Sequence, residues 1–389
     1  MAYKVRTRDE HFLNDGSPKR ILALDGGGLR GILTLSYLAE LELLLKERHG
    51  ASEEFRLSHY FDLVAGTSTG AIIAAALACG MSVAEITAKY LELGRKVFQK
   101  GPFHLGLIRA LYDEKQLIGE LKKVYGASTT LGNEALATGL LVVTKRLDTG
   151  SPWPISNNPR GKYYGPRPDV DVIANSAYPL WQVVRASTAA PRYFDPEKIE
   201  ISRGKENETA VVGEFVDGGV SPFNNPALQA LMYATMDGYS IGWPIGAEKL
   251  LVVSVGTGSR DPQVTPAKLA AENALKSLLS LMDDCATLSE ILLQWMSTSQ
   301  TARSIDREMG DLRHDLIGPA PLISYLRYNV TLAKESLSSL GINFTDEKIE
   351  ALSAMDDPGN MTALQDVGAK AAKQQVRAED FPANFDLMG

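Results

Sequence analysis

The sequence predicts an α/β sandwich whose central sheet is parallel at least in part. Short apolar runs alternate with longer segments of helical periodicity, and this alternation is typical of strand–helix–strand units. Two of the apolar runs end in glycine-rich turns that lead into helical patterns. The chain has 389 residues, 44% hydrophobic and 22% charged. Such a chain can form one large domain with elaborations, or two domains.

The first strand–helix unit is predicted at residues 19–49. The run "KRILAL" (19–24) is apolar and compatible with a strand, and glycines follow it. From Leu29 onward, large aliphatic residues recur every third or fourth position, which indicates a helix. Basic residues at 46, 48 and 49 and a glycine at position 50 indicate the C-terminal end of that helix.

Further elements follow the same pattern. A second strand is predicted at 60–65 ("YFDLVA"), followed by "GTSTG" and a helix rich in small residues. The stretch "SVAE" (82–85) has the spacing of a capping box and predicts the start of another helix. The remaining strand predictions are 138–147, 215–217 and 249–256.

These patterns suggest three segments of the chain. Residues 1–18 form an N-terminal segment, and residues 19–260 are expected to form the main domain. Within it, the proline-rich stretch 148–180 is expected to run over the surface. Beyond Thr265 the pattern is helical almost throughout. We therefore expect 261–389 to be a mainly helical extension packed on or beside the main domain.

Charge and cysteine usage restrict the partners and the compartment. The 40 Lys and Arg against 47 Asp and Glu give a net charge of −7. No basic run is present, so nucleic acid is not an expected partner. Neither Cys79 nor Cys285 has metal-type spacing, and no metal is expected. Without an apolar leader or a run of about 18 apolar residues, we expect a cytoplasmic protein that can contact a membrane peripherally.

The stretch "LALDGGGLRG" (22–31) contains G-x-G-x-x-G at Gly26, Gly28 and Gly31. Placed between a strand and a helix, it fits a dinucleotide fingerprint or a phosphate loop. The same backbone N–H groups at a helix N-terminus can bind any oxyanion. A dinucleotide site also requires an acidic residue at the end of the second strand. The region about 20 positions on is instead a helix end and a loop.

The stretch "GTSTG" is a G-x-S-x-G motif, from Gly66 to Gly70, between a predicted strand and a predicted helix. That context is typical of a nucleophile elbow, which would present the Ser68 hydroxyl at the end of the strand. A simple Ser/Gly turn that caps the helix is the alternative.

A serine nucleophile needs a base, and the chain offers two candidates. Ser68, Asp217 and His314 stand in the order of an α/β-hydrolase triad. However, "DLRHDL" around His314 is charged and is more typical of a surface segment. The other four histidines have no recognisable setting: His11, His49, His59 and His104.

The second candidate is a carboxylate alone. In "VDGGVSPFNNP", Asp217 ends a predicted strand and is followed by Gly218 and Gly219. Its carboxylate could take the Ser68 proton directly, provided that its pKa is raised. An ordinary Asp-Gly turn is the alternative interpretation.

In this order, the three motifs resemble those of the patatin-like phospholipase family. They are D-G-G-G-x-R-G at 25–31, G-x-S-x-G at 66–70 and D-G-G at 217–219. "RASTAAPRYFDP" (185–196) resembles the family's A-S-x-A-x-P segment. The resemblance spans about 20–260 and makes that domain the catalytic one. It implies a three-layer α/β/α sandwich with a central, largely parallel sheet and a helical C-terminal part.

The resemblance also implies a mechanism. Ser68 would be the nucleophile and Asp217 the proton acceptor of a Ser–Asp dyad that needs no metal or cofactor. The substrate would be a phospholipid or lysophospholipid, hydrolysed through an acyl-enzyme. An acyltransferase could use the same intermediate.

The resemblance places the oxyanion hole at the glycine loop. Its donors would be the backbone N–H groups of Gly26, Gly27 and Gly28, with Arg30 supporting the loop. A nucleotide-binding protein that uses Gly26–Gly31 as a phosphate loop is the alternative from a different class, but it leaves the other two motifs unexplained. Bacterial members of the family include antiphage defence effectors that cyclic nucleotides switch on. For substrate contact, the stretch 103–112 and Trp153 could form a lipid-facing lip, or could belong to the core.

Overall fold

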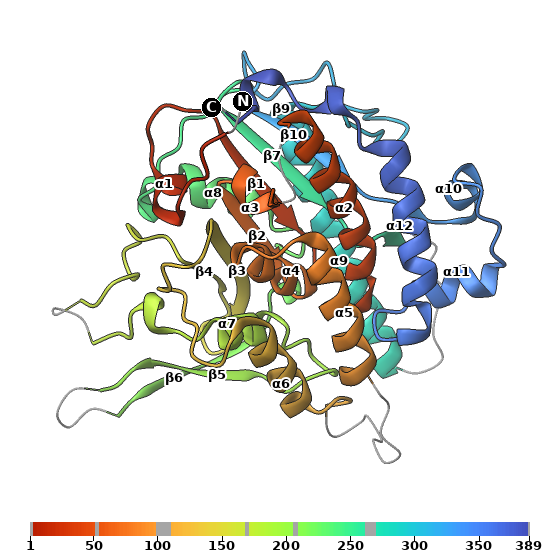
Figure 1. The fold of residues 1–389 in the computed structure, drawn as a ribbon. Coiled ribbons are helices and arrows are strands. Elements are labelled where there is room, and N and C mark those ends of the chain that lie inside the picture. Colours follow the sequence, from red (N-terminus) through yellow and green to blue (C-terminus); the bar gives the residue numbers. More distant parts are fainter. Residues whose placement is uncertain are drawn as a thin grey trace.

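The computed structural model describes residues 3–50, 54–98, 110–167, 171–204, 209–260 and 270–387. Within these residues, a nine-stranded sheet runs in the order β5-β6-β3-β2-β1-β7-β10-β9, with β4 beside β3 (Figure 1). Its strands are β1 (Lys19–Leu24), β2 (Leu63–Thr67), β3 (Gly139–Arg146), β4 (Pro152–Ser156), β5 (Glu197–Ser202), β6 (Val211–Asp217), β7 (Leu250–Val255), β9 (Ser297–Thr298) and β10 (Ile323–Tyr328).

The sheet is parallel from β3 through β9. Strands β4, β5 and β6 join it in the antiparallel sense. A largely parallel sheet was predicted and is confirmed. Parallel strands end at a common edge, so the turns after β1 and β2 lie close together.

Helices cover both faces of the sheet. One face packs against α2 (Gly31–Arg48), α4 (Thr69–Ala78), α5 (Val83–Val97), α6 (Glu114–Tyr125), α7 (Leu180–Ser187) and α12 (Met361–Gln375). The other packs against α1 (Arg8–Phe12), α8 (Ala227–Thr235) and the C-terminal part of α9 (Ala270–Trp295). Strand β1 serves both layers, because Leu22 and Leu24 belong to the first core and Ile21 and Ala23 to the second. The three-layer sandwich is therefore confirmed.

Smaller elements complete the described chain. They are α3 (Leu57–Tyr60), α10 (Lys334–Ser339), α11 (Asp346–Leu352) and the two-stranded sheet of β8 (Ser259–Arg260) with β11 (Thr331–Leu332). None of the helices in the described ranges is both long and apolar enough to cross a membrane.

Most predicted elements occur where expected, but several boundaries differ; the strand predicted at 215–217, for example, spans 211–217. Helix α5 begins after Ser82, whose side chain and that of Glu85 form the predicted capping box. The second strand is 63–67 rather than 60–65, because Tyr60 ends α3 and the Asp62 side chain accepts the Arg20 N–H. The stretch 148–180 is not only a surface excursion, since it supplies β4.

The chain after residue 260 is less uniformly helical than predicted. Helix α9 lies there, but β10 pairs with β7 in the central sheet, and α12 packs on α2. The run "ISYLRY" (323–328) is buried throughout, as suits a strand covered on both faces. These six residues are flanked by segments with helical patterns, and for this reason the strand was not predicted from the sequence.

Candidate active site

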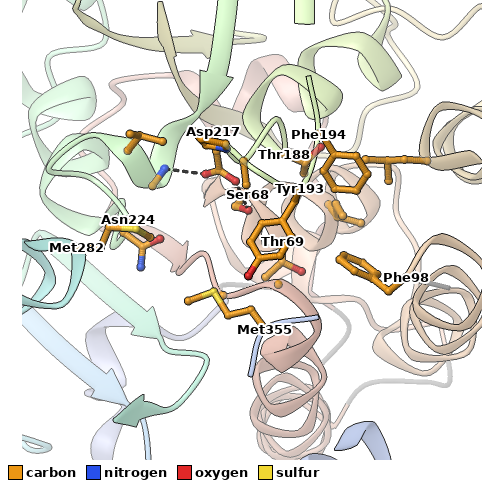
Figure 2. A pocket seen from close by; sticks show the side chains of 18 of the residues that line it. Ser68, Thr69, Phe98, Thr188, Tyr193, Phe194, Asp217, Asn224, Met282 and Met355 are labelled. Atoms are coloured by element: carbon orange, nitrogen blue, oxygen red, sulfur yellow. Dashed lines mark hydrogen bonds between the residues drawn. The ribbon is translucent and has the colours of Figure 1, made fainter. Parts of the chain in front are cut away.

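Ser68 stands in the sharp turn between β2 and α4 (Figure 2). Its backbone has φ 56° and ψ −122°, a conformation that a residue with a side chain rarely adopts. The turn needs a very close approach of two chains, because a Cβ on Gly70 would lie 2.1 Å from the Leu24 carbonyl oxygen. The strand, the turn and the helix therefore have the geometry of a nucleophile elbow.

A second serine holds the turn in place. The Ser68 N–H donates to Ser187 Oγ at 2.9 Å, and the Ser187 hydroxyl donates to the Val143 carbonyl at 2.6 Å. Ser187 lies in the segment 185–196 that the family resemblance includes, and it links the turn to β3. It engages an N–H that a helix N-terminus would otherwise leave unpaired.

Alanine at position 187 should loosen the elbow without removing a reacting group. We expect Ser187→Ala to lower kcat for ester hydrolysis by about tenfold, in line with the roughly 1–3 kcal/mol cost of an unpaired buried donor. The change in KM should be small. Steady-state kinetics at a temperature where the variant is folded would test this, and an unchanged kcat would contradict it.

Asp217 is the last residue of β6 and lies directly against Ser68. The Ser68 hydroxyl donates to Asp217 Oδ2 at 2.6 Å, and the Gly219 N–H donates to Oδ1 at 2.7 Å. The carboxylate is 4% exposed. Burial raises its pKa to about 6, and the hydrogen bond from Ser68 opposes that rise most. A carboxylate of this kind is a stronger base than an exposed aspartate.

The direct hydrogen bond leaves no place for an imidazole between these two side chains. His314 is exposed, and no histidine in the described part of the chain lines the cavity that contains Ser68. His11 is buried elsewhere, against Asp62. His104 lies outside the described residues. Nor do the described residues contain a group of three His, Cys, Asp or Glu suited to a metal ion.

The glycine loop lies beside Ser68, and its peptide groups are held individually. The Gly26 N–H donates to the Asn224 carbonyl at 3.0 Å, so this amide is engaged. The Gly26 carbonyl accepts from the Thr257 hydroxyl at 3.0 Å, and the Gly27 carbonyl accepts from the Arg30 N–H at 3.3 Å. In a trans peptide the N–H points opposite to the C=O. Anchoring these two carbonyls therefore directs the N–H groups of Gly27 and Gly28 away from the anchors.

Gly27 and Gly28 both line the cavity beside Ser68. Gly28 has φ +58°, and a Cβ there would lie 2.3 Å from the Met355 carbonyl oxygen. A side chain at this position would therefore be strained and would clash. The buried Arg30 guanidinium donates to the Gly258 carbonyl at 3.1 Å, which ties the start of α2 to the turn after β7.

The cavity beside Ser68 opens to solvent, and most of its wall is apolar. Its large apolar side chains include Ile72, Leu93, Phe98, Leu117, Tyr193, Phe194, Met282 and Met355. Of the two alternatives for Trp153, the structure supports the core: Trp153 packs on Phe215 at the sheet and does not line this cavity. Residues 103–109 lie outside the described residues, and Tyr112 is buried.

Several residues of the site were not predicted from the sequence. The Tyr90 hydroxyl donates to the Gly28 carbonyl at 2.6 Å. Thr257 and Asn224 contact Gly26, and Met282 and Met355 come from the chain beyond 260. Of these residues, Asn224 alone had a local signal in the sequence, because it is one of two adjacent asparagines just after the Asp217 motif.

The raised pKa of Asp217 has a consequence for folding. The group ionises at about 6 in the fold but near its usual 3.8 when unfolded, so the fold loses stability as pH rises from about 4 to 6. At 1.36 kcal/mol for each pKa unit, this loss is up to about 3 kcal/mol. We expect Asp217→Asn to be more stable relative to wild type at pH 8 than at pH 4 by that amount. Urea unfolding at both pH values would measure it, and an equal difference at both would contradict it.

Comparisons with known proteins identify the family of this chain. The family model "Patatin-like phospholipase" matches residues 22–231. A "cGAMP-activated phospholipase" of Escherichia coli is 29% identical over 64% of this chain and 65% of its own length, slightly under two thirds of that relative. A Vibrio cholerae protein of the same name is 25% identical over 92% of this chain and 93% of its own. "Patatin-like protein 1" of Arabidopsis thaliana is 32% identical over 70% of this chain and 66% of its own length. The chain belongs to the patatin-like phospholipase family.

Proposed function

We propose that this protein hydrolyses the acyl ester bonds of phospholipids or lysophospholipids with a Ser68–Asp217 dyad. The observation that carries the proposal is the 2.6 Å hydrogen bond from the Ser68 hydroxyl to a buried carboxylate at the wall of an apolar cavity. A serine hydroxyl is a weak nucleophile until a base takes its proton. Here the base and the nucleophile are already in contact.

In the first step, Ser68 Oγ attacks the ester carbonyl carbon while its proton passes to Asp217. The carbonyl oxygen becomes an oxyanion, which accepts hydrogen bonds from the N–H groups of Gly27 and Gly28. The N-terminus of α4 begins at Thr69 and adds positive potential at the same place. The Gly26 N–H is left out of this proposal because Asn224 already engages it.

In the second step, the C–O bond to the alcohol breaks, and the leaving oxygen takes the proton from Asp217. The acyl group remains on Ser68. A water molecule then gives a proton to Asp217 as it attacks the acyl carbon, and Ser68 regains that proton as the fatty acid leaves. A pKa of about 6 leaves Asp217 mostly ionised at pH 7, yet basic enough for both transfers.

The cavity wall supports a long acyl chain as the substrate group. Phe98, Phe194 and Met282 belong to an apolar lining that could not satisfy the hydrogen-bonding groups of a polar substrate. Methionine side chains adapt to chains of different shape, which suits a flexible acyl group.

We also propose that a cyclic dinucleotide activates this enzyme. The proposal is supported by the Vibrio cholerae relative, which is named for activation by cGAMP and aligns over 92% of this chain. That alignment must include much of the sequence beyond the family match at 22–231.

Fatty acid release tests both proposals. Wild-type protein, with and without cGAMP, is incubated with phosphatidylglycerol/phosphatidylethanolamine vesicles and with lysophospholipid, and the products are measured by mass spectrometry. We expect fatty acid release that cGAMP increases and that EDTA leaves unchanged. An absence of release under all conditions would contradict the hydrolase proposal, and equal release without cGAMP would contradict activation. Transfer of the acyl group to an added alcohol in place of water would identify an acyltransferase.

A further inference from the structure

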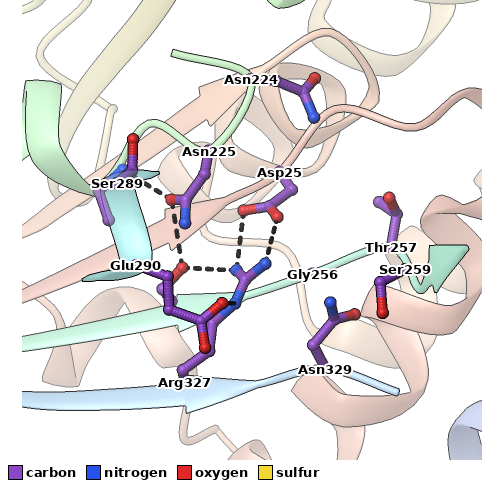
Figure 3. A network of polar contacts seen from close by, with 12 residues as sticks. Asp25, Asn224, Asn225, Gly256, Thr257, Ser259, Ser289, Glu290, Arg327 and Asn329 are labelled. Carbon is purple, nitrogen blue, oxygen red and sulfur yellow. Dashed lines mark hydrogen bonds and ion pairs between the residues drawn. The ribbon is translucent and has the colours of Figure 1, made fainter. Parts of the chain in front are cut away.

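Asp25 leads into the glycine loop, but its side chain does not line the cavity. It is 5% exposed and meets Arg327 of β10 in a two-point contact (Figure 3). Arg327 Nη1 donates to Oδ1 at 3.0 Å, and Nη2 donates to Oδ2 at 2.6 Å. A fork of this kind fixes both the distance and the orientation of the carboxylate.

Arg327 is itself held from two other elements. Its Nη1 also donates to Ser254 Oγ of β7 at 2.7 Å, and its Nε lies 3.8 Å from a Glu290 carboxylate oxygen of α9. Glu290 is buried and accepts two hydrogen bonds from Arg303, at 2.6 and 3.1 Å. Two carboxylates and two guanidinium groups thus form a compact cluster, and three of the four come from the chain beyond residue 260: Glu290 from α9, Arg327 from β10 and Arg303 from the segment between β9 and β10.

The cluster contacts the start of the glycine loop through Asp25. The Asp25 N–H donates to the Val255 carbonyl at 3.1 Å, while its side chain is held by Arg327. The next amide, that of Gly26, is held by Asn224. The peptide groups that carry the Gly27 and Gly28 N–H follow within the next two residues. A rotation at Asp25 would therefore redirect the N–H groups that line the cavity.

We propose that Arg327 is a positioning residue of the active site, which acts through Asp25 to hold the glycine loop in the geometry that binds the oxyanion. The inference rests on the proposed oxyanion role of Gly27 and Gly28. Arg327 lies outside the family match at 22–231. The chain beyond residue 260 would thus complete the active site as well as the sheet.

A buried ion pair can stabilise the fold without positioning any group of the active site. A second buried ion pair in the chain serves as a matched control for this possibility. Arg20, near the other end of β1, is also buried and donates to the buried Asp62 at 3.1 Å. Arg20→Gln breaks a buried pair near the start of β1, at the opposite end of that strand from the glycine loop. Comparing it with Arg327→Gln separates a loss of stability from a loss of loop geometry.

We expect Arg327→Gln to lower kcat by about 10²-fold, similar to the loss of one oxyanion donor, with KM changed less than about threefold. Phosphonylation of Ser68 by an alkyl fluorophosphonate should slow by a similar factor, because its P=O oxygen uses the same donors. Arg327→Lys keeps the charge without the fork and should lose about tenfold. Guanidinium ion at millimolar concentration should partly restore Arg327→Ala. Arg20→Gln should lower the melting temperature while kcat stays within about threefold of wild type.

Two results would overturn the inference. One is a folded Arg327→Gln variant that keeps wild-type kcat and labelling rate. The other is an Arg20→Gln variant that loses as much kcat as Arg327→Gln. If Arg327→Gln does not fold, the test rests on Arg327→Lys and on the rescue of Arg327→Ala by guanidinium ion. Full activity in Arg327→Lys, or no rescue of Arg327→Ala, would contradict the positioning role. Failure of the proposed function is distinguishable, because the wild type itself would then neither release fatty acid nor be labelled.

Discussion

Alanine at position 68 is expected to abolish acyl-ester hydrolysis, with kcat reduced by roughly 10⁴- to 10⁶-fold, as for the loss of a nucleophilic serine in a hydrolase. The reason is that Ser68 Oγ forms the covalent bond to the acyl group, and no water held at this position would be as well aligned. Substrate binding should persist, because the apolar wall of the cavity does not include the hydroxyl. The measurement is fatty acid release under saturating lysophospholipid.

The control for this substitution is another buried serine. Ser58 is 1% exposed in α3 and does not line the cavity. Ser58→Ala should keep kcat within about twofold, since it removes a buried hydroxyl of the same kind away from the reacting groups. Hydrolysis at the wild-type rate in Ser68→Ala would refute the nucleophile assignment.

Asparagine at position 217 is expected to lower kcat by about 10³- to 10⁴-fold, near the upper range for loss of a general base. The amide is almost isosteric but cannot accept the Ser68 proton. In the wild type, kcat/KM should fall about tenfold for each pH unit below an apparent pKa of about 6, because only the ionised carboxylate acts as base. The residual activity of Asp217→Asn should lack this acid limb.

His314→Ala is the matched control, because it removes the histidine that could complete a triad by chain order. Since His314 is exposed and does not line the cavity, its loss should leave the rate and the pH profile unchanged. Activity retained in Asp217→Asn but lost in His314→Ala would replace the dyad with a triad.

The features predicted best are those that a short stretch of sequence determines. The run 19–24 is apolar and is followed by glycines, a pattern that predicts a buried strand. Strand β1 spans these residues. Ser82 and Glu85 satisfy each other's backbone groups locally, and α5 starts there. The elbow depends on Gly66 and Gly70 flanking Ser68, a spacing that is visible in the sequence.

The features that were missed depend on the order of strands across the sheet. Arg327 meets Asp25 because β7 lies between β1 and β10, and no local pattern encodes that order. Ser187 reaches the Ser68 amide for the same kind of reason, from α7, which packs beside α4 on the same face of the sheet. Engagement of the Gly26 N–H by Asn224 is also a long-range contact, and it narrows the proposed oxyanion donors from three amides to two.

The most direct test of the central claim is the mass of the protein after reaction with a long-chain alkyl fluorophosphonate. Attack by Ser68 Oγ would form an O–P bond and release fluoride. We expect one adduct, mapped to the peptide that contains Ser68, formed slowly in Asp217→Asn and absent in Ser68→Ala. An adduct on a different serine, or rapid ester hydrolysis by a protein that forms none, would contradict it.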